Sequence, residues 1–452
     1  MAKVLLIQAN YDIDSNGEVP WMPIALVEIA TFINENGQEA KILDRNIYPD
    51  NNKLLSILKD FNPDIVGMTC YTSQIIKDVK QIARLTKENS KALVIVGGIH
   101  ATLEPKSLLD FGYIDYIVRG EGEYPLLEIC QLIDKSKANK ANILKIENVN
   151  YNKLRPLINL RDMPIPNYDL LEVKKYPFAS FYTSRGCPGK CTFCYNQSKT
   201  LRIYDTKKTI AMITGVIEKY KIKEFNILDD NFANQSMRTT EICDALSKYN
   251  SIFHCFLRTD QVTDKVMSEL KKAGCWIIQF GFESGSQRIL DFLNKGTTVQ
   301  QNELAIKQCK KYGIFVDGSF MIGLPTENNT ELNETISFIK KNKPDISNIK
   351  IYKPYPSTEL YNYCVKNKLI QVPSDLDEWK DFCELKEGNV NVSNIPTEVL
   401  IKTLKDFDRT RSSSIAIRKS LFLLKSGHIN YLLFKARNIL TNKLTVNKNA
   451  KK

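Results

Sequence analysis

The regular alternation of short apolar runs with helical patterns limits what this chain can fold into more than any other feature. In its first third, the apolar runs are Val4–Ile7, Ala40–Leu43, Ile65–Met68, Leu93–Val96 and Ile114–Val118. Between them, apolar residues repeat near a 3.6-residue period at 24–33, 54–61, 75–85 and 126–133. Strands and helices that alternate at this spacing predict a doubly wound, Rossmann-like parallel sheet. We therefore expect an α/β domain over residues 1–135.

A compact cysteine motif lies near the middle of the chain. Cys187, Cys191 and Cys194 fall within eight residues, beside Gly186, Pro188 and Gly189. A short loop with this spacing can direct three thiolates at an iron–sulfur cubane and leave the fourth iron without a protein ligand. A zinc site is disfavoured, because neither a histidine nor a fourth cysteine close by completes a ligand set.

The motif resembles the signature of the radical S-adenosylmethionine superfamily, with Phe193 in its aromatic position. The resemblance implies that Cys187, Cys191 and Cys194 bind a [4Fe-4S] cluster whose fourth iron is chelated by S-adenosylmethionine. It also implies an electron donor such as flavodoxin or ferredoxin. Strand-like runs recur at 225–228, 253–257, 276–280, 315–322 and 349–352. With the strand that enters Cys187 they make six, which predicts the partial (β/α)6 TIM barrel of that family over residues 176–365.

Polar and glycine residues follow four consecutive strands of this barrel, where the chemistry of such folds is found. The residues that we expect to contact S-adenosylmethionine are Phe193, Asp229, Asp230, Arg258, Glu283, Ser284 and Gly323. Carboxylates can accept hydrogen bonds from its amino group, a guanidinium can fork onto its carboxylate, and a glycine lets the backbone approach adenine. Glu283 and Ser284 are expected at the ribose hydroxyls. Taken singly, such carboxylates also serve as helix caps or solvated turn residues.

The front domain resembles the cobalamin-binding domain that precedes many radical S-adenosylmethionine barrels. The similarity lies in the segments GGIHAT and YIVRGEGEYPLLEI. It implies cobalamin contacts from the loops that follow the strands, at Thr69, Thr72, Ser73, Gly97, Gly98, Gly120, Glu121 and Gly122. The chain lacks the D-x-H-x-x-G string of domains that ligate cobalt with histidine, so we expect no protein histidine on cobalt. His100, the histidine of this domain, fits a loop role better.

Charge separates the end of the chain from the rest. The net charge is +12, and residues 401–452 hold 13 basic against two acidic residues. Apolar and basic residues alternate there, which is typical of a helix on an anionic membrane surface and also of a helix packed on the barrel. We predict a linker over 136–175, rich in Lys, Asn and Pro, and a basic, mainly helical region over 366–452. Nucleic acid is not expected as a partner.

No apolar run is long enough for a spanning helix or a signal-peptide core, so we expect a cytoplasmic protein, with peripheral contact at the inner membrane face left open. The combined resemblance implies methylation of an unactivated carbon in a small-molecule or lipid-like substrate. One S-adenosylmethionine would supply the radical, and another would remethylate cobalamin. Two alternatives stay open: a cyclase, rearrangement or coupling enzyme without methyl transfer, and a radical enzyme whose front domain is a sensor that binds no cobalamin. Methylthiolation of transfer RNA is disfavoured, because the front domain offers only Cys70 and Cys130.

Overall fold

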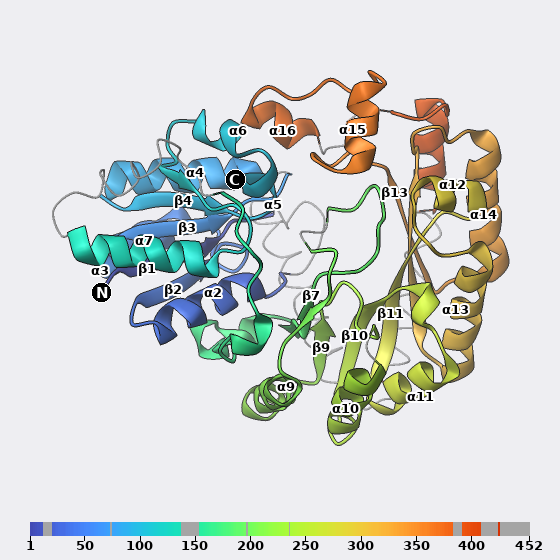
Figure 1. Cartoon of the computed structure of the whole chain (residues 1–452), viewed down its shortest axis with the longest axis horizontal. Helices are drawn as coiled ribbons and strands as arrows, with labels where there is room; N and C mark the ends of the chain where they lie inside the picture. The colour runs from blue at the N-terminus through green and yellow to red at the C-terminus, as the bar shows by residue number, and fades with distance from the viewer. Residues whose placement is uncertain are drawn as a thin grey trace, which may run out of the picture.

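The computed structural model describes residues 1–11, 20–72, 75–136, 153–195, 198–234, 236–382, 391–407 and 424. Within them, two parallel sheets stand side by side, with a loop-rich region between them (Figure 1). The first sheet belongs to the front domain and the second to a partial barrel. The predicted α/β class is confirmed.

The front sheet has the order β2-β1-β3-β4-β5. Its strands are β1 (Lys3–Gln8), β2 (Glu39–Asp44), β3 (Ile65–Thr69), β4 (Leu93–Gly97) and β5 (Tyr116–Ile117). Side chains of β1 alternate between two cores: Leu5 and Ile7 pack with one, Val4 and Leu6 with the other. The strand order reverses between β1 and β3, the kind of switch point at which doubly wound sheets bind ligands beyond their strand ends.

Helices cover both faces of this sheet. The face of Val4 and Leu6 packs against α2 (Ile24–Glu35) and α7 (Glu123–Ser136). The face of Leu5 and Ile7 packs against α3 (Asn51–Phe61) and α4 (Ile75–Asn89). Two short helices that the sequence did not predict, α5 (Ile99–Leu103) and α6 (Pro105–Leu109), follow β4.

The barrel sheet has six parallel strands in the order β13-β12-β11-β10-β9-β6, as predicted. They are β6 (Ala179–Phe181), β9 (Glu224–Ile227), β10 (Ile252–Leu257), β11 (Cys275–Glu283), β12 (Phe315–Ile322) and β13 (Ile346–Ile351). The helices between them are α9 (Thr206–Tyr220), α10 (Ser236–Leu246), α11 (Asp264–Lys272), α12 (Gln287–Phe292), α13 (Val299–Tyr312) and α14 (Asn329–Asn342). Figure 1 shows α10, α11, α13 and α14 on the outer side of the sheet, so its inner face looks toward the front domain.

The starts of the barrel helices are encoded locally. The Asp205 carboxylate accepts a hydrogen bond from the Lys208 amide at the start of α9, and Thr263 caps α11 in the same way. Thr298 and Asn328 each form a capping box, at α13 and α14. Such caps satisfy backbone amides that have no partner inside the helix, and each contributes about 1 kcal/mol.

A small hairpin that the sequence did not predict connects β6 to the rest of the barrel. Its strands β7 (Ser184–Arg185) and β8 (Arg202–Ile203) pair antiparallel, with Arg185 opposite Arg202. All three motif cysteines lie on the loop between these strands. We call β7, β8 and the intervening loop the cysteine hairpin.

The predicted linker is packed rather than loose where it is described. It forms short 3-10 turns at Leu160–Asp162, Tyr168–Leu170 and Val173–Lys175. Leu160 and Tyr168 are buried, and the Tyr168 hydroxyl donates to the Ser180 carbonyl at 2.7 Å. This segment therefore braces the front domain against the first barrel strand.

The chain returns to the front domain after the barrel. Helix α15 (Glu359–Lys366) is followed by α16 (Leu376–Phe382). Trp379 of α16 is 1% exposed and packs into the part of the front-domain core that α4 covers. Residues 397–407 are helical, and Leu400 packs against Ile322 and Ile351 of the barrel. The predictions for the basic tail beyond 407 fall outside the described residues, Leu424 excepted. Across the described part of the chain, no helix is both long and apolar enough to cross a bilayer.

Candidate active site

A cavity of about 400 Å³ lies between the front domain and the cysteine hairpin. The front domain lines it with residues at the ends of β3 and β4 and in the loops after β4 and β5, namely Thr69, Gly97, Gly98, Gly120, Glu121 and Gly122. The hairpin contributes Ser184, Arg185, Gly186, Tyr195, Ser198 and Arg202. Its volume, and its lining of apolar residues with a few polar groups, are typical of a ligand pocket. Thus the predicted cobalamin contacts, except Thr72 and Ser73, share one cavity with the base of the cysteine motif.

Glycine is required at the turn after β4. Gly98 has a φ of 97°, and a Cβ there would lie 2.6 Å from Thr69 Oγ1 and 2.7 Å from the Cys70 carbonyl oxygen. The missing side chain lets the β4 loop lie directly on the β3 loop. Deeper in, the cavity runs along the sheet beneath α2 and α7, past apolar or small residues that include Leu6, Gly67 and Ile95.

Thr72 and His100 belong to the domain interior instead. His100 is fully buried, with Nδ1 2.9 Å from Thr72 Oγ1 and Nε2 3.0 Å from Ser107 Oγ. Burial lowers its pKa to about 4, and its ring meets Trp379 edge-on. The prediction of a cobalamin contact is therefore not supported for Thr72, whose hydroxyl faces the imidazole. Ser73 lies outside the described residues.

The cysteine hairpin presents its thiols toward the barrel mouth. Cys187 and Cys191 are half-buried, whereas Cys194 is exposed. Gly189 lies against the thiols, since a Cβ added there would lie 3.2 Å from Arg258 Nη1, 3.4 Å from Cys187 Sγ and 3.8 Å from Cys191 Sγ. In the described residues, no three Cys, His, Asp or Glu side chains converge on a single metal position.

Three of the predicted S-adenosylmethionine contacts reach the neighbourhood of these thiols. Arg258 Nη1 lies 4.0 Å from Cys191 Sγ, while its Nη2 donates to Asp260 at 2.9 Å and to the Lys295 carbonyl at 3.0 Å. Asp230 lines the interdomain cavity next to Gly186. Glu283 ends β11 at a bulge, with a φ of 61° that few non-glycine residues adopt.

Lys295 is a neighbour that the sequence did not flag. Its Nζ lies 2.8 Å from Glu283 Oε1, and both side chains are buried. Burial alone would lower the pKa of Lys295, but the Glu283 charge raises it above its usual range. The same ammonium lies 5.9 Å from the Phe193 ring centroid. The one hint in the sequence is that Lys295 precedes a glycine in the loop after α12. Lysine–glycine pairs are too common in loops for this to mark a site residue.

Three other predicted contacts serve the packing of the barrel. The Asp229 carboxylate is 1% exposed and accepts hydrogen bonds from the Thr183 amide at 2.6 Å, the Thr183 hydroxyl and the Ser184 hydroxyl. The Ser284 hydroxyl lies 3.0 Å from Thr335 Oγ1 on α14, on the outer side of the sheet. A Cβ added at Gly323 would lie 3.0 Å from Leu400 Cδ1 and 3.1 Å from Ile351 Cγ2, so this glycine lies against the apolar packing of the barrel. Asp229 and Ser284 therefore hold strand ends in place, and Glu283 is the better candidate for the ribose.

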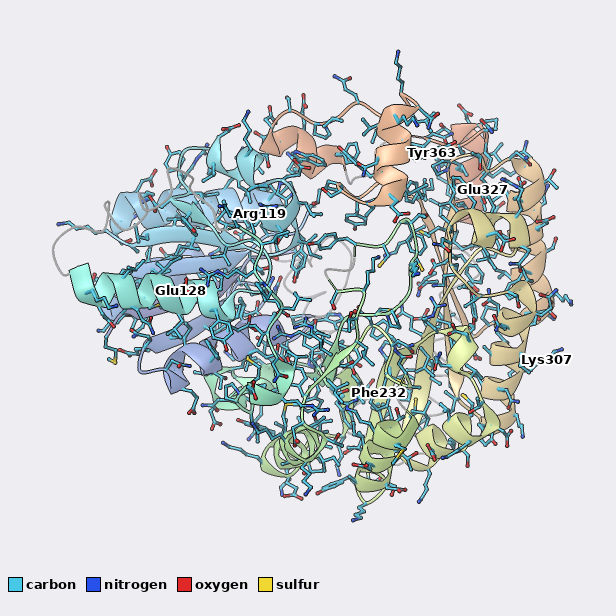
Figure 2. The ribbon with its side chains drawn as sticks, in the orientation of Figure 1. Arg119, Glu128, Phe232, Lys307, Glu327 and Tyr363 are labelled. Carbon is cyan, nitrogen blue, oxygen red and sulfur yellow. The ribbon has the colours of Figure 1, made fainter. Side chains whose placement is uncertain are left out.

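The loop after β12 is stabilised by a buried carboxyl group. Glu327 Oε2 accepts hydrogen bonds from the amides of Gly323 at 2.6 Å and Leu324 at 3.0 Å, while its Oε1 is buried without a partner. Burial raises the pKa of Glu327 to about 7. Figure 2 shows Glu327 at the end of the barrel where Tyr363 of α15 also lies.

This burial predicts a pH-dependent effect of Glu327→Gln. Because the folded state binds the proton more tightly than the unfolded state, the free energy of unfolding of the wild type falls as pH rises from about 4.5 to about 7. The glutamine carbonyl keeps both amide contacts and carries no charge, so the variant should gain of the order of 3 kcal/mol at pH 8 and little at pH 4.5. Chemical denaturation at the two pH values measures this. Equal effects at both, or the same gain in the exposed control Glu334→Gln, would contradict it.

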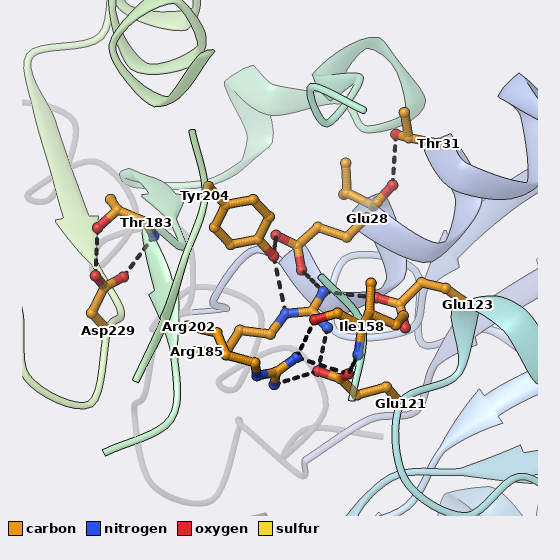
Figure 3. Close-up of polar contacts among 11 residues, drawn as sticks. Glu28, Thr31, Glu121, Glu123, Ile158, Thr183, Arg185, Arg202, Tyr204 and Asp229 are labelled. Atoms are coloured by element: carbon orange, nitrogen blue, oxygen red, sulfur yellow. Dashed lines mark hydrogen bonds and ion pairs between the residues drawn. The ribbon is translucent and has the colours of Figure 1, made fainter. Parts of the chain in front are cut away.

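The hairpin and the front domain meet in a network of charged side chains, which Figure 3 shows. Arg185 donates to Glu28 and Glu123 at 2.7 Å and to Glu121 at 2.9 Å. Arg202 binds Glu121 at 2.7 and 3.0 Å. Burial by itself would raise the pKa of Glu121, but Arg202 and Arg185 hold it below its usual range. Glu121, predicted as a cobalamin contact, thus lines the cavity while bound to two arginines.

The inner face of the barrel sheet carries polar side chains among apolar ones such as Phe315 and Met321. Along β12 the burial alternates strictly, with Val316 and Phe320 packed against the helices and Asp317 and Ser319 half-exposed on the other face. Gln279 Nε2 donates to Ser319 Oγ at 3.0 Å, and Asn348 of β13 bonds Asp317. The interior of a closed eight-stranded barrel is usually filled by bulky apolar residues. Half-exposed polar side chains here indicate a surface that contacts a ligand.

Comparison with known proteins agrees with this division of the chain. Residues 13–130 match the B12 binding domain family and residues 181–339 match the radical SAM superfamily. An uncharacterized methyltransferase of Pyrococcus horikoshii is 35% identical over 368 residues, which cover 77% of this chain and 79% of that protein. The anaerobic magnesium-protoporphyrin IX monomethyl ester cyclase of Rubrivivax gelatinosus is 28% identical over 79% of this chain and 69% of its own length.

Solved structures show the same fold. The radical S-adenosylmethionine methyltransferase TsrM from Kitasatospora setae, with cobalamin and a [4Fe-4S] cluster bound, superposes with a TM-score of 0.68 at 16% identity. The superposition covers 87% of this chain and 83% of TsrM. The chain therefore belongs to the radical S-adenosylmethionine superfamily, as one of its cobalamin-binding enzymes, and its cofactors are a [4Fe-4S] cluster, S-adenosylmethionine and cobalamin.

Proposed function

We propose that this enzyme methylates an unactivated carbon of a small molecule. The observation that carries the proposal is the shared cavity: Thr69, Gly97 and Gly98 of the cobalamin domain and Gly186 and Tyr195 of the cysteine hairpin line the same space. A carbon radical reacts with any neighbour it meets, so the group that completes the reaction must lie close to where the radical forms. A cavity between both cofactor domains meets this requirement.

The residues at the barrel mouth fit a cluster and S-adenosylmethionine. Cys187, Cys191 and Cys194 supply three thiolates for iron, and a guanidinium at Arg258 lies 4.0 Å from Cys191 Sγ, where it can bind a carboxylate beside the cluster. Asp230 can accept hydrogen bonds from an ammonium group. Glu283, oriented by Lys295, can accept from ribose hydroxyls.

The front-domain part of the cavity fits cobalamin. Its mouth is formed by glycine loops, which leave room for a broad planar ligand, and its inner part is an apolar slot along the sheet. Both ring nitrogens of His100 are already engaged inside the domain, so this histidine is not available as a cobalt ligand. When bound, the three cofactors would together supply an organic radical and a transferable methyl group.

The inner face of the barrel favours a substrate with hydrogen-bonding groups over a lipid-like one. Gln279, Ser319, Asp317 and Asn348 present donors and acceptors that are half-exposed. Gln279 bonds Ser319 and Asn348 bonds Asp317, and an apolar ligand would remove water from their remaining donor and acceptor positions without replacing its hydrogen bonds. We also propose a low-potential donor such as flavodoxin or ferredoxin. Contact of the basic tail with an anionic membrane stays a prediction, which vesicle flotation of a tail-deleted chain would test.

Methyl transfer can be tested without the final substrate. The anaerobically reconstituted enzyme, given a reductant and S-adenosylmethionine labelled with deuterium in its methyl group, should transfer the label to its cobalamin. With an extract of small polar metabolites, a product should gain one labelled methyl group in place of hydrogen. A product that loses two hydrogens and carries no label would contradict methylation and favour cyclisation, the activity named for the Rubrivivax gelatinosus relative.

A further inference from the structure

Arg185 of the cysteine hairpin makes four hydrogen bonds, three of them to carboxylates of the cobalamin domain. All three nitrogens of Arg185 are used: Nη2 bonds Glu28 and Glu123, Nη1 bonds Glu121, and Nε donates to the Tyr204 hydroxyl at 3.0 Å. Its three carboxylate partners are at most 10% exposed. Contacts this short and this buried are screened little by solvent and fix the geometry of a planar fork.

The partners come from separate elements of the front domain. Glu28 lies on α2, Glu123 opens α7, and Glu121 lies in the loop between β5 and α7. Arg185 itself stands on β7, two residues before Cys187. A single side chain thus ties the base of the cysteine loop to the two helices that cover the cavity, as Figure 3 shows.

The second strand of the hairpin is tied to the same carboxylate. Arg202 lies directly opposite Arg185 in the β7–β8 pair, where two like charges would repel. Glu121 lies between them and bonds both, and its Oε2 also accepts from the Ile158 amide of the linker at 2.8 Å. Both strands of the hairpin are therefore bonded to the front domain, in addition to the contacts that the hairpin makes with the barrel.

We propose that Arg185 is a positioning residue that fixes the distance between the cluster and cobalamin. The proposal rests on the proposed function for the presence of both cofactors, and on the Arg185 contacts for the rest. Both strands at the base of the cluster loop are bonded to walls of the cobalamin cavity. Loss of these bonds frees the hairpin to shift relative to the cavity, although the thiols that hold iron are untouched.

Arg185→Met removes the charge and all guanidinium donors but keeps a side chain of similar length. Two milder variants are Arg185→Lys, which keeps a charged donor, and Glu123→Gln, which keeps a carbonyl acceptor. The matched control is Arg155→Met, which breaks the ion pair between Arg155 of the linker and Glu128 of α7. Like Arg185–Glu123 this pair involves α7, but its two side chains are about half-exposed. The readout is the dipolar coupling between cob(II)alamin and the reduced cluster in the holoenzyme, measured by pulsed electron paramagnetic resonance. Iron and cobalt contents are measured on the same samples.

The wild type and Arg155→Met should give one narrow distance distribution. The Arg185 variants and Glu123→Gln should give a broader distribution or a longer distance at unchanged iron and cobalt content. The change should be largest in Arg185→Met and smaller in Arg185→Lys and Glu123→Gln. A wild-type distribution in Arg185→Lys and Glu123→Gln would overturn the proposal, even where Arg185→Met failed to fold.

Amide hydrogen exchange of the hairpin in the cofactor-free chain separates this inference from the proposed function. Exchange in residues 198–203 should quicken in Arg185→Lys and Glu123→Gln but not in Arg155→Met, because open hairpin strands lose the protection of β7–β8 pairing. A wild type that retained no cobalamin would contradict the proposed function, and the exchange comparison would still decide the role of Arg185. Unchanged exchange in both milder variants would overturn the inference.

Discussion

Replacing Cys191 by alanine is expected to abolish the iron–sulfur cluster. The Cys191 thiol lies in the loop of the cysteine hairpin, 4.0 Å from Nη1 of the Arg258 guanidinium. A cubane of this type is held by three protein thiolates, so the loss of one leaves an iron without its protein ligand. Iron, sulfide and the visible charge-transfer absorption should all fall to background after anaerobic reconstitution.

The matched control is Cys309→Ala. Cys309 is fully buried in the barrel core on α13 and takes part in packing alone, so its loss leaves a small cavity but no missing ligand. This variant should lower the melting temperature slightly and keep its full iron content. If Cys191→Ala retained as much iron as Cys309→Ala, the assignment of the motif to a cluster would be wrong.

Gly97→Leu is expected to block cobalamin binding while the cluster stays in place. A Cβ at Gly97 meets only ordinary contacts, the nearest being the Val118 carbonyl oxygen at 3.6 Å, so the backbone accepts a side chain. The rest of the leucine must occupy the cavity that Gly97 lines. Overpacking a filled site costs about 1–3 kcal/mol, which corresponds to roughly tenfold to hundredfold weaker binding.

The measurement is the cobalamin absorbance retained after desalting, with the iron content as an internal reference. Gly215→Leu is the matched control: this glycine is exposed on α9, a Cβ added there would meet no atom within 4 Å, and helix propensity favours leucine at the position. It should retain both cofactors. Retention of cobalamin by Gly97→Leu at wild-type affinity would place the corrin elsewhere.

The parts of the site that follow strand ends could be predicted, because period-2 and period-3.6 patterns locate strands and parallel strands end at one edge. Thr69, Gly97, Gly98 and Gly120 therefore share a cavity as expected. The cysteine motif could be predicted equally well, since its ability to bind a cluster depends on the spacing of three cysteines within one short loop.

Sequence patterns fail where the face of a residue depends on a local irregularity. A register shift between Gly281 and Glu283 turns Glu283 toward Lys295 and sends Ser284 outward to Thr335. Strict alternation cannot anticipate such a bulge. The role of Asp229 is hidden for another reason: its partners Thr183 and Ser184 lie 45 or 46 residues earlier, so the hydrogen bonds exist only once β6 and β9 are paired.

The same limit explains why the sequence does not reveal the role of Arg185. Its partners lie 62, 64 and 157 residues away, and nothing in the sequence tells which of 51 acidic residues will meet it. Glu121 is predicted as a ligand contact because it lies in a glycine loop, and the structure shows that two arginines bind it first. Ion pairs between domains are a property of the packed chain and become visible only in three dimensions.

The central claim is that one chain holds a cluster and cobalamin together across the interdomain cavity. The most direct test is the cobalt and iron content of a single desalted sample of the wild-type chain, reconstituted anaerobically with iron, sulfide and cobalamin. The account predicts that both metals stay bound, at about one cobalt for every four irons. Iron retained without cobalt would contradict it.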